Sequence, residues 1–191
     1  MPSDDGAEIT NKIWLTSKAR IYSEKRYRSY DHLSHLLLCL LSIIVIAITI
    51  VRSRLDLHNW IDEYTLIFAV TILAFSLVVY GFRFGEKATL HRECYLRLQR
   101  LHDCKHDIED VARQYHEIIA AYPNHQPIDY EHLVLDRTLF NRRSLVGPDN
   151  KEIVWTFSML AKWLVHLLIF WLIALLVPIL SIYLFLLLWA P

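Results

Sequence analysis

Glycine is scarce in this sequence. Only four of its 191 residues are glycine, and they form no glycine-rich loop. Loops of that kind bind nucleotide phosphates through backbone N–H groups, so the composition argues against nucleotide binding of this type. No strand-turn-helix pattern presents a nucleophilic serine either, although Ser, His and Asp occur along the chain.

Cysteine is also rare, with three in the chain. Cys39 lies in an apolar run, while Cys94 and Cys104 fall on one predicted helix, about 15 Å apart along its axis. That separation is too long for a disulfide. The sequence therefore predicts no disulfide framework, which agrees with a cytoplasmic location for the middle of the chain.

Charged residues are absent from two long apolar runs. Residues 33–51 and 64–82 each contain nineteen residues without Asp, Glu, Lys or Arg. At about 1.5 Å per residue, a helix of this length crosses the hydrocarbon core of a bilayer, which is about 30 Å thick. The segment between the two runs is too short to form another domain. We therefore expect a transmembrane helical hairpin.

A third apolar run covers residues 153–189 and would form a helix about 55 Å long. This is nearly twice the thickness of the bilayer core. Its first half carries Ser158, Lys162 and His166, which lie four residues apart on one stripe, while its second half carries no charge. We expect an interfacial helix over about 152–166, followed by one span that Pro178 kinks.

The positive charges predict the orientation. Of the twenty Lys and Arg residues, six precede the first span, eleven lie in 83–151 and only two lie between the first two spans. The positive-inside rule places the N-terminus and the middle region in the cytoplasm. The C-terminus then lies outside, and the predicted location is the inner membrane.

Two cytoplasmic helices are expected, over about 10–32 and about 85–122. Apolar residues of the second recur at alternating spacings of three and four, which predicts one continuous seam for packing within the chain or between chains. This assembly seam consists of Leu98, Leu101, Ile108, Val111, Tyr115, Ile118 and Tyr122.

The stretch YPNHQPIDYEHL follows this helix. Its two prolines force a turn, and Asp129 is placed to cap a short helix over about 130–140, a contribution of about 1 kcal/mol. A structural turn explains most of these residues. The alternative is a signalling turn in which Asn124, His125 and Asp129 contact a ligand or partner.

A metal site is a weaker hypothesis. His102 and His106 are spaced i, i+4, with His91 and Cys94 earlier on the same predicted helix. A closed site needs three or four converging ligands, which this spacing alone does not supply. His35 and His166 could transfer protons only if they lay within the membrane. Both lie near predicted span ends, where their side chains can reach the interface, so proton transfer is also a weak hypothesis. We therefore predict no catalytic, metal or cofactor-binding residues, and no enzyme activity.

The sequence also resembles a known family. The segments KIWLTSKARIYSEKRYRSYDHLSHLLL and YPNHQPIDY, together with the two closely spaced spans, are similar to the SLATT family of two-transmembrane domains. The resemblance covers roughly residues 10–140, and the third apolar run departs from a two-span plan. It implies a membrane effector of prokaryotic antiphage defence, acting beside nucleotide-signal synthases, nucleotide sensors or reverse transcriptases.

These observations predict an all-α membrane protein: a transmembrane hairpin with cytoplasmic helical extensions and a third hydrophobic helix. We expect a SLATT-like domain over 1–140, and a linker, interfacial helix and third span over 141–191. The predicted function is a triggered homo-oligomer that permeabilises the inner membrane and arrests growth. The alternative is a membrane anchor for a cytoplasmic partner, such as a reverse transcriptase or nucleotide sensor. Direct nucleic-acid binding stays an open alternative. Basic residues beside spans are also expected because they set the membrane orientation and contact anionic headgroups.

Overall fold

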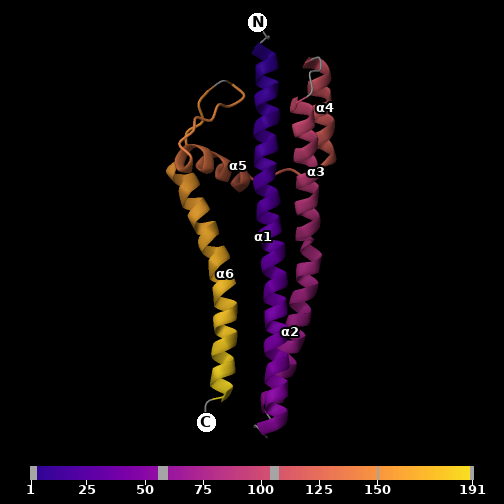
Figure 1. Cartoon of the computed structure of the whole chain (residues 1–191), viewed down its shortest axis with the longest axis vertical. Helices are drawn as coiled ribbons and strands as arrows, with labels where there is room; N and C mark the ends of the chain where they lie inside the picture. Colours follow the sequence, from indigo (N-terminus) through magenta and orange to yellow (C-terminus); the bar gives the residue numbers. More distant parts are fainter. Residues whose placement is uncertain (1–3, 56–59, 104–107, 150, 190–191) are drawn as a thin grey trace. The chain divides into compact units, whose positions relative to one another are not determined.

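The computed structural model describes residues 4–55, 60–103, 108–149 and 151–189. The prediction of an all-α chain with three hydrophobic helices is confirmed (Figure 1). The described residues contain six α-helices and one π-helix, η1. Their bounds are α1 Asp4–Leu55, α2 Trp60–Phe82, α3 Phe84–Asp103, α4 Ile108–Ala121, α5 Pro127–Val134, η1 Leu135–Phe140 and α6 Phe157–Trp189.

Among the described residues, three stretches of helix are long and apolar enough to cross a membrane. They lie in Gly6–Ile50, Thr65–Asp103 and Phe157–Ile179. The predicted first span continues the helix predicted before it without a break, since α1 is one helix of 52 residues. Arg83 separates α2 from α3 and has a left-handed backbone, with φ of 50°. This single residue ends the second apolar helix next to the predicted span boundary.

The chain divides into two compact units. The first contains Met1–Arg28 and Gly85–His166, and the second contains Ser29–Phe84 and Leu167–Pro191. The boundary that we expect at residue 140 does not coincide with this division, because residues 141–166 pack with the first unit. The first unit holds the polar and charged packing, and the second holds the apolar helices.

In the first unit, α1 lies between α3 and α4 on one side and α5 on the other (Figure 1). Ile13 of α1 packs with Leu98 of α3 and Tyr115 of α4. Leu15, two residues further on, packs in a second cluster with Leu133 and Val134 of α5. Residues two apart point to different sides of a helix, so α1 supplies one face to each cluster.

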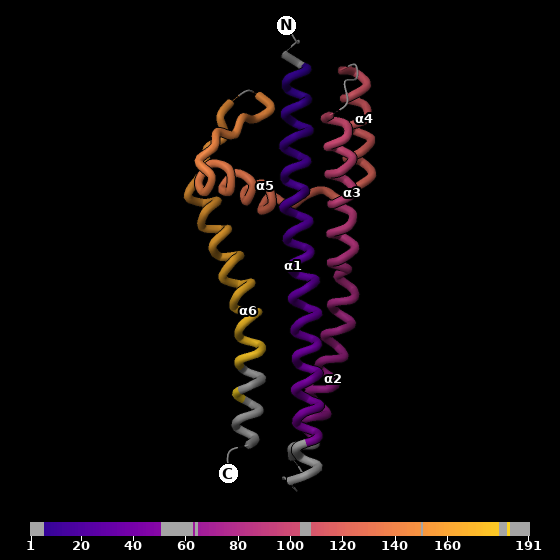
Figure 2. Tube along the Cα trace, viewed as in Figure 1, coloured from indigo at the N-terminus to yellow at the C-terminus, as the bar shows by residue number. Residues whose placement is uncertain are grey.

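The predicted single helix over 85–122 is wrong. It is two helices, α3 and α4, and α4 runs back along α3, as the trace in Figure 2 shows. The Tyr122 hydroxyl lies 3.4 Å from Glu93 Oε2, and the Arg97 guanidinium lies over the Tyr122 ring at 5.4 Å. In one continuous helix, positions 93 and 122 would lie about 44 Å apart.

The second unit exposes its apolar side chains. Large exposed residues include Ile43, Ile46, Leu66, Leu73, Leu168 and Leu172. Tyr30 contacts two rings of the same unit, Phe84 and Phe170, with centroid distances of 5.6 and 6.2 Å. Exposed apolar faces on this scale indicate a lipid environment or contact with other chains.

The third hydrophobic segment is one helix that begins at Phe157, five residues after the expected start, and continues through Pro178 to Trp189. Residues 151–156 are not helical; Ile153 N–H donates to Leu145 O at 2.7 Å. The proposed interfacial position of its first turns stays a prediction.

Candidate functional site

The turn over residues 122–126 connects α4 to α5. Helix α4 ends at Ala121, because Pro123 has no N–H and restricts the residue before it. Helix α5 begins with Pro127, whose fixed φ suits a first helical position. Pro123, Asn124 and Gln126 are exposed, while His125 is partly buried. This 122–126 turn is the predicted signalling turn together with Asp129.

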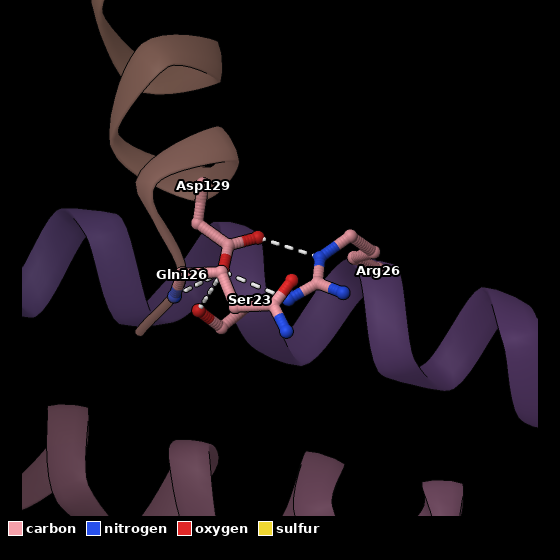
Figure 3. A network of polar contacts seen from close by, with 4 residues as sticks. All are labelled: Ser23, Arg26, Gln126 and Asp129. Carbon is pink, nitrogen blue, oxygen red and sulfur yellow. Dashed lines mark hydrogen bonds and ion pairs between the residues drawn. The ribbon is translucent and has the colours of Figure 1, made fainter. Parts of the chain in front are cut away.

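Asp129 is the centre of a buried polar network. Its Oδ1 accepts from Arg26 Nε at 2.8 Å, and its Oδ2 accepts from Arg26 Nη2 at 3.0 Å and from the Ser23 hydroxyl at 2.6 Å. Figure 3 shows Ser23 and Arg26 reaching from α1 to this carboxylate of α5. Asp129 therefore joins two helices that are more than a hundred residues apart in the sequence.

The predicted capping role of Asp129 needs a correction of position. Residue 126 is the N-cap of α5, and Asp129 is the third residue of the helix. Its Oδ2 accepts from the Gln126 backbone N–H at 3.0 Å, which is the carboxylate half of a capping box. The helix begins three residues earlier than expected because Pro127 occupies its first position.

Opposing effects set the protonation state of Asp129. Burial alone raises the pKa of a carboxyl group, but hydrogen bonds from Arg26 and Ser23 and the charge of Arg26 outweigh burial and lower the pKa of Asp129. Asp129 is 2% exposed and ionised at neutral pH. The network is thus a buried ion pair with a charge-assisted hydrogen bond from a serine.

Arg20 and two histidines lie beside this network. Arg20 is 1% exposed, and its Nη1 donates to the Pro123 carbonyl at 2.5 Å. His91 of α3 is 2% exposed and stacks on Tyr27, with 5.5 Å between ring centroids. Burial, followed by the charge of Arg20, lowers the pKa of His91 to about 4 and also lowers the pKa of His125. Both rings are neutral at pH 7.

The other two residues of the signalling turn are placed differently. The Asn124 side chain is exposed, and its Oδ1 accepts from the His125 backbone N–H at 3.1 Å. The His125 ring faces inward, and its Nδ1 is buried. The structure thus brings His125 and Asp129 into one cluster with α1 and leaves the Asn124 side chain at the surface.

A second set of contacts joins α1, α5 and the start of α6. The Tyr22 hydroxyl donates to Asp136 Oδ2 at 2.7 Å, and the Tyr22 ring contacts His132, whose ring also contacts Trp163. Lys162 donates to Glu131 Oε1 at 2.6 Å. Lys162 belongs to the polar stripe that we expect on the third hydrophobic segment, and it forms an ion pair with Glu131 of α5.

Most of the assembly seam lies within the chain. Leu98, Leu101 and Tyr115 are buried in the cluster with Ile13. Val111, Ile118 and Tyr122 are partly buried and pack against that cluster, whereas Ile108 is 39% exposed. Seam residues from both helices therefore face α1.

The possible metal ligands do not converge in the described part of the chain. Residues 104–107, which include Cys104 and His106, lie outside it. His91 and Cys94 are buried, and His102 is exposed beside Asp103. Among the described residues, no three His, Cys, Asp or Glu side chains are grouped so that they could hold a metal ion.

Residues 4–187 match the family described as SMODS and SLOG-associating 2TM effector domain family 5. The chain belongs to this family. No curated protein and no solved structure matches the sequence.

Membership in this effector family extends the resemblance found in the sequence. The matched residues continue past residue 140 and include most of α6, so the third hydrophobic helix lies within the family match. The family description names two transmembrane segments, whereas three helices here are apolar and long enough to span.

Sequence reasoning missed the buried polar face of α1 in this effector domain. Ser17, Arg20 and Ser23 are buried and recur every three residues beyond Ile13. A charged residue at such spacing is usually solvated, so the pattern alone favours exposure. These residues could have been found from their helical position, because they continue the same face of α1 that Ile13 occupies.

Proposed function

We propose that this protein is a membrane effector of a prokaryotic antiphage system. When triggered, it assembles into an oligomer that permeabilises the inner membrane and stops growth. Its membership in a family of two-transmembrane effector domains supports this proposal most directly. No catalytic step is part of it.

The hydroxyl groups of the apolar helices explain why several chains are needed. Ser42, Thr49 and Thr71 each donate to the carbonyl four residues earlier in their own helix. Ser76 donates to the Leu73 carbonyl. With Thr65, these are scattered hydroxyl oxygens that the two predicted spans of the hairpin offer in one chain, and an ion in hydrocarbon is too costly without a surrounding polar surface. Several copies would place such oxygens around a shared path.

The apolar side chains that are exposed in the single chain indicate which surfaces could join several chains. The seam could join chains only if its residues left the core around Ile13, since most of them pack there. Ile108 and the exposed apolar faces of α1, α2 and α6 are the surfaces that stay accessible. We therefore assign assembly to those helix faces, with the cytoplasmic unit controlling it.

The test is a membrane-potential dye in cells that carry the defence system and are infected with phage. Depolarisation before growth arrest, dependent on this chain, is the expected result. Thr49→Val and Thr71→Val remove one hydroxyl from each predicted span of the hairpin and should slow depolarisation at equal abundance. Thr10→Val is the matched control, because Thr10 makes the same bond, to the Gly6 carbonyl, outside the predicted spans.

Growth arrest with an intact membrane potential would overturn the leak. It would favour the alternative, an anchor that holds a cytoplasmic partner such as a reverse transcriptase, a nucleotide-signal synthase or a nucleotide sensor. If depolarisation is unchanged in both span variants, the leak does not pass along these hydroxyl groups. A leak of another kind would then explain the depolarisation.

A further inference from the structure

Arg20 is a buried cation with an incomplete set of acceptors. A guanidinium has five N–H donors and stays charged in proteins. Arg20 Nη1 donates to the Pro123 carbonyl, but Arg20 Nε is buried and has no acceptor among the described residues. Burying a charge is costly unless it is paired and hydrogen-bonded, so this side chain needs a stronger acceptor than one carbonyl.

The carboxylate of the neighbouring network is already occupied. Asp129 accepts four hydrogen bonds: two from Arg26, one from Ser23 and one from the Gln126 backbone. Oδ2 accepts three of these bonds and Oδ1 accepts one, all from donors other than Arg20. Arg20 and Arg26 carry two positive charges near the single negative charge of Asp129. The buried carboxylate of this part of α1, Glu24, pairs with Arg28 at 2.6 Å. Arg20 therefore has no carboxylate partner among the described residues, and these five groups together lack one negative charge.

Two imidazoles complete the surroundings of Arg20. The Nδ1 atoms of His91 and His125 are both buried and, like Arg20 Nε, have no partner in the described part of the chain. Arg20 comes from α1, His91 from α3 and His125 from the 122–126 turn. Three separate segments therefore carry buried nitrogen atoms without a partner in the described part of the chain, and the charge of Arg20 acts on both rings.

We propose that Arg20, His91 and His125 form a binding site for a phosphate group, which replaces the Pro123 carbonyl as the acceptor of the guanidinium. The site is built from side chains, so it needs no glycine-rich loop. It does not depend on the membrane leak proposed above.

The chemistry favours phosphate over a neutral ligand. Arginine binds phosphate through two parallel N–H···O bonds, and charge-assisted bonds of this kind are about twice as strong as neutral ones. A phosphate group carries about −1.5 to −2 charges at neutral pH, which offsets the missing negative charge. The imidazoles can donate to the remaining oxygens, and a bound anion would favour their protonation.

The Pro123 carbonyl can be replaced without disrupting the network. It lies in a turn that is not helical, and its bond from Arg20 holds the first half of that turn. Moving this carbonyl away from Arg20 breaks that bond but leaves His125 in place, and Asp129 keeps its contacts with Ser23 and Arg26. Phosphate would then take the position of the carbonyl.

The experiment uses the full chain in phosphatidylcholine nanodiscs, with ¹⁵N-labelled arginine. Inorganic phosphate replaces chloride at constant ionic strength and neutral pH. We expect the Arg20 Nε–H resonance, assigned with Arg20→Lys, to shift and saturate. The Arg26 Nε–H group is an internal control, because it already donates to Asp129 and should not shift. No saturable change at Arg20, or an equal change at Arg26, would overturn the proposal.

A thermal-unfolding comparison adds a variant test. Phosphate should raise the unfolding temperature of wild type and of Arg113→Gln, an exposed substitution, but not of Arg20→Gln. An equal rise in Arg20→Gln would contradict the proposal. If Arg20→Gln does not fold, the resonance titration of the wild-type chain decides the question.

A parallel titration with adenosine monophosphate distinguishes the source of the group. Saturation at lower concentration than with inorganic phosphate would mean that the site takes the phosphate of a nucleotide. Equal midpoints would mean that it takes free phosphate. Both results support the site, and saturation by neither ligand overturns it. Because binding is measured without a membrane potential, failure of the leak test leaves this result unaffected.

Discussion

Arg26 and Asp129 form a two-point ion pair between α1 and the first turn of α5. The Arg26 Nε and Nη2 atoms lie 2.8 and 3.0 Å from the two carboxylate oxygens. The Asp129 side chain is 2% exposed and the Arg26 side chain 12%. Since the same carboxylate accepts from the Gln126 N–H, one side chain both starts α5 and joins it to α1.

Asp129→Asn should therefore destabilise the protein by more than the loss of a helix cap. The substitution keeps the shape of the side chain but removes the buried negative charge that pairs with Arg26. Breaking a buried pair in this way typically costs about 3–5 kcal/mol, compared with about 1 kcal/mol for a cap alone. Tryptophan fluorescence during denaturant unfolding of the purified chain measures the difference.

The control is Asp110→Asn. Asp110 and Arg113 also form an ion pair, with 2.6 Å between Arg113 Nη2 and Asp110 Oδ1, but both side chains are mostly exposed. An exposed pair of this kind contributes about 0–1 kcal/mol. Similar losses in the two variants would show that burial of Asp129 does not decide its contribution.

Substitutions at a buried and at an exposed seam residue should affect folding and assembly differently. Leu98 is fully buried, and Leu98→Ala should cost about 2–5 kcal/mol through the cavity that it leaves. Ile108 is 39% exposed, so Ile108→Ala should change stability by about 0.5 kcal/mol or less. Denaturant unfolding measures both values.

Chemical cross-linking of triggered cells then tests assembly. If Ile108→Ala keeps wild-type stability but loses oligomers, the exposed end of the seam contributes to contacts between chains. Wild-type cross-linking in Ile108→Ala would assign assembly to other surfaces. A stability loss in Ile108→Ala as large as that in Leu98→Ala would contradict the placement of the seam.

The reversal between α3 and α4 shows what sequence reasoning could not find. Residues 104–107 read CKHD and contain neither Pro nor Gly, the residues that most often mark a turn. The apolar spacing continues across them, since residues of α3 and α4 pack in the same cluster. A periodic pattern records which residues are buried, but two helices packed on one partner give the same pattern as one long helix.

The spans and the 122–126 turn were predictable for a different reason. Uncharged runs of nineteen residues and two closely spaced prolines have few alternative structures. The partners of Asp129 were not predictable, because Ser23 and Arg26 are more than a hundred residues away and nothing in either segment specifies the pairing. Sequence reasoning assigned Asp129 a local cap, and the structure adds the contact across helices.

Acidification should weaken the first unit through His91. Its pKa is about 4 in the folded chain, compared with about 6.5 when unfolded, so the unfolded chain binds more protons between these values. The contribution of neutral His91 is complete above about pH 6.5 and is lost as the pH falls toward 4, a change of about 3 kcal/mol. Unfolding free energies measured across this range test the slope.

His91→Leu should reduce this slope without abolishing it. The pKa values of His125 and His132 are also lowered, mainly by burial, and these groups act in the same direction. His116→Leu, at an exposed position of α4, is the control for the substitution itself. A slope that is the same in His91→Leu and wild type would show that His91 is not held neutral by the fold.

The proposed topology makes a last prediction that does not depend on activity. Only two of the twenty basic residues lie between the first two spans, so we place that loop outside and the first unit in the cytoplasm. A cysteine at position 59 should then react with a membrane-impermeant thiol reagent in intact cells. A cysteine at Ser144, an exposed residue of the first unit, should react only after the cells are opened.

The native cysteines do not obscure this comparison when they are replaced first. Cys39→Ser and Cys94→Ala remove an exposed thiol of the first span and a buried one of α3, and Cys104→Ser removes the third. Both single-cysteine chains are labelled in parallel, in intact and in permeabilised cells. Labelling at 144 but not at 59 in intact cells would reverse the orientation. The phosphate site would then face the periplasm, where cytoplasmic nucleotides could not reach it.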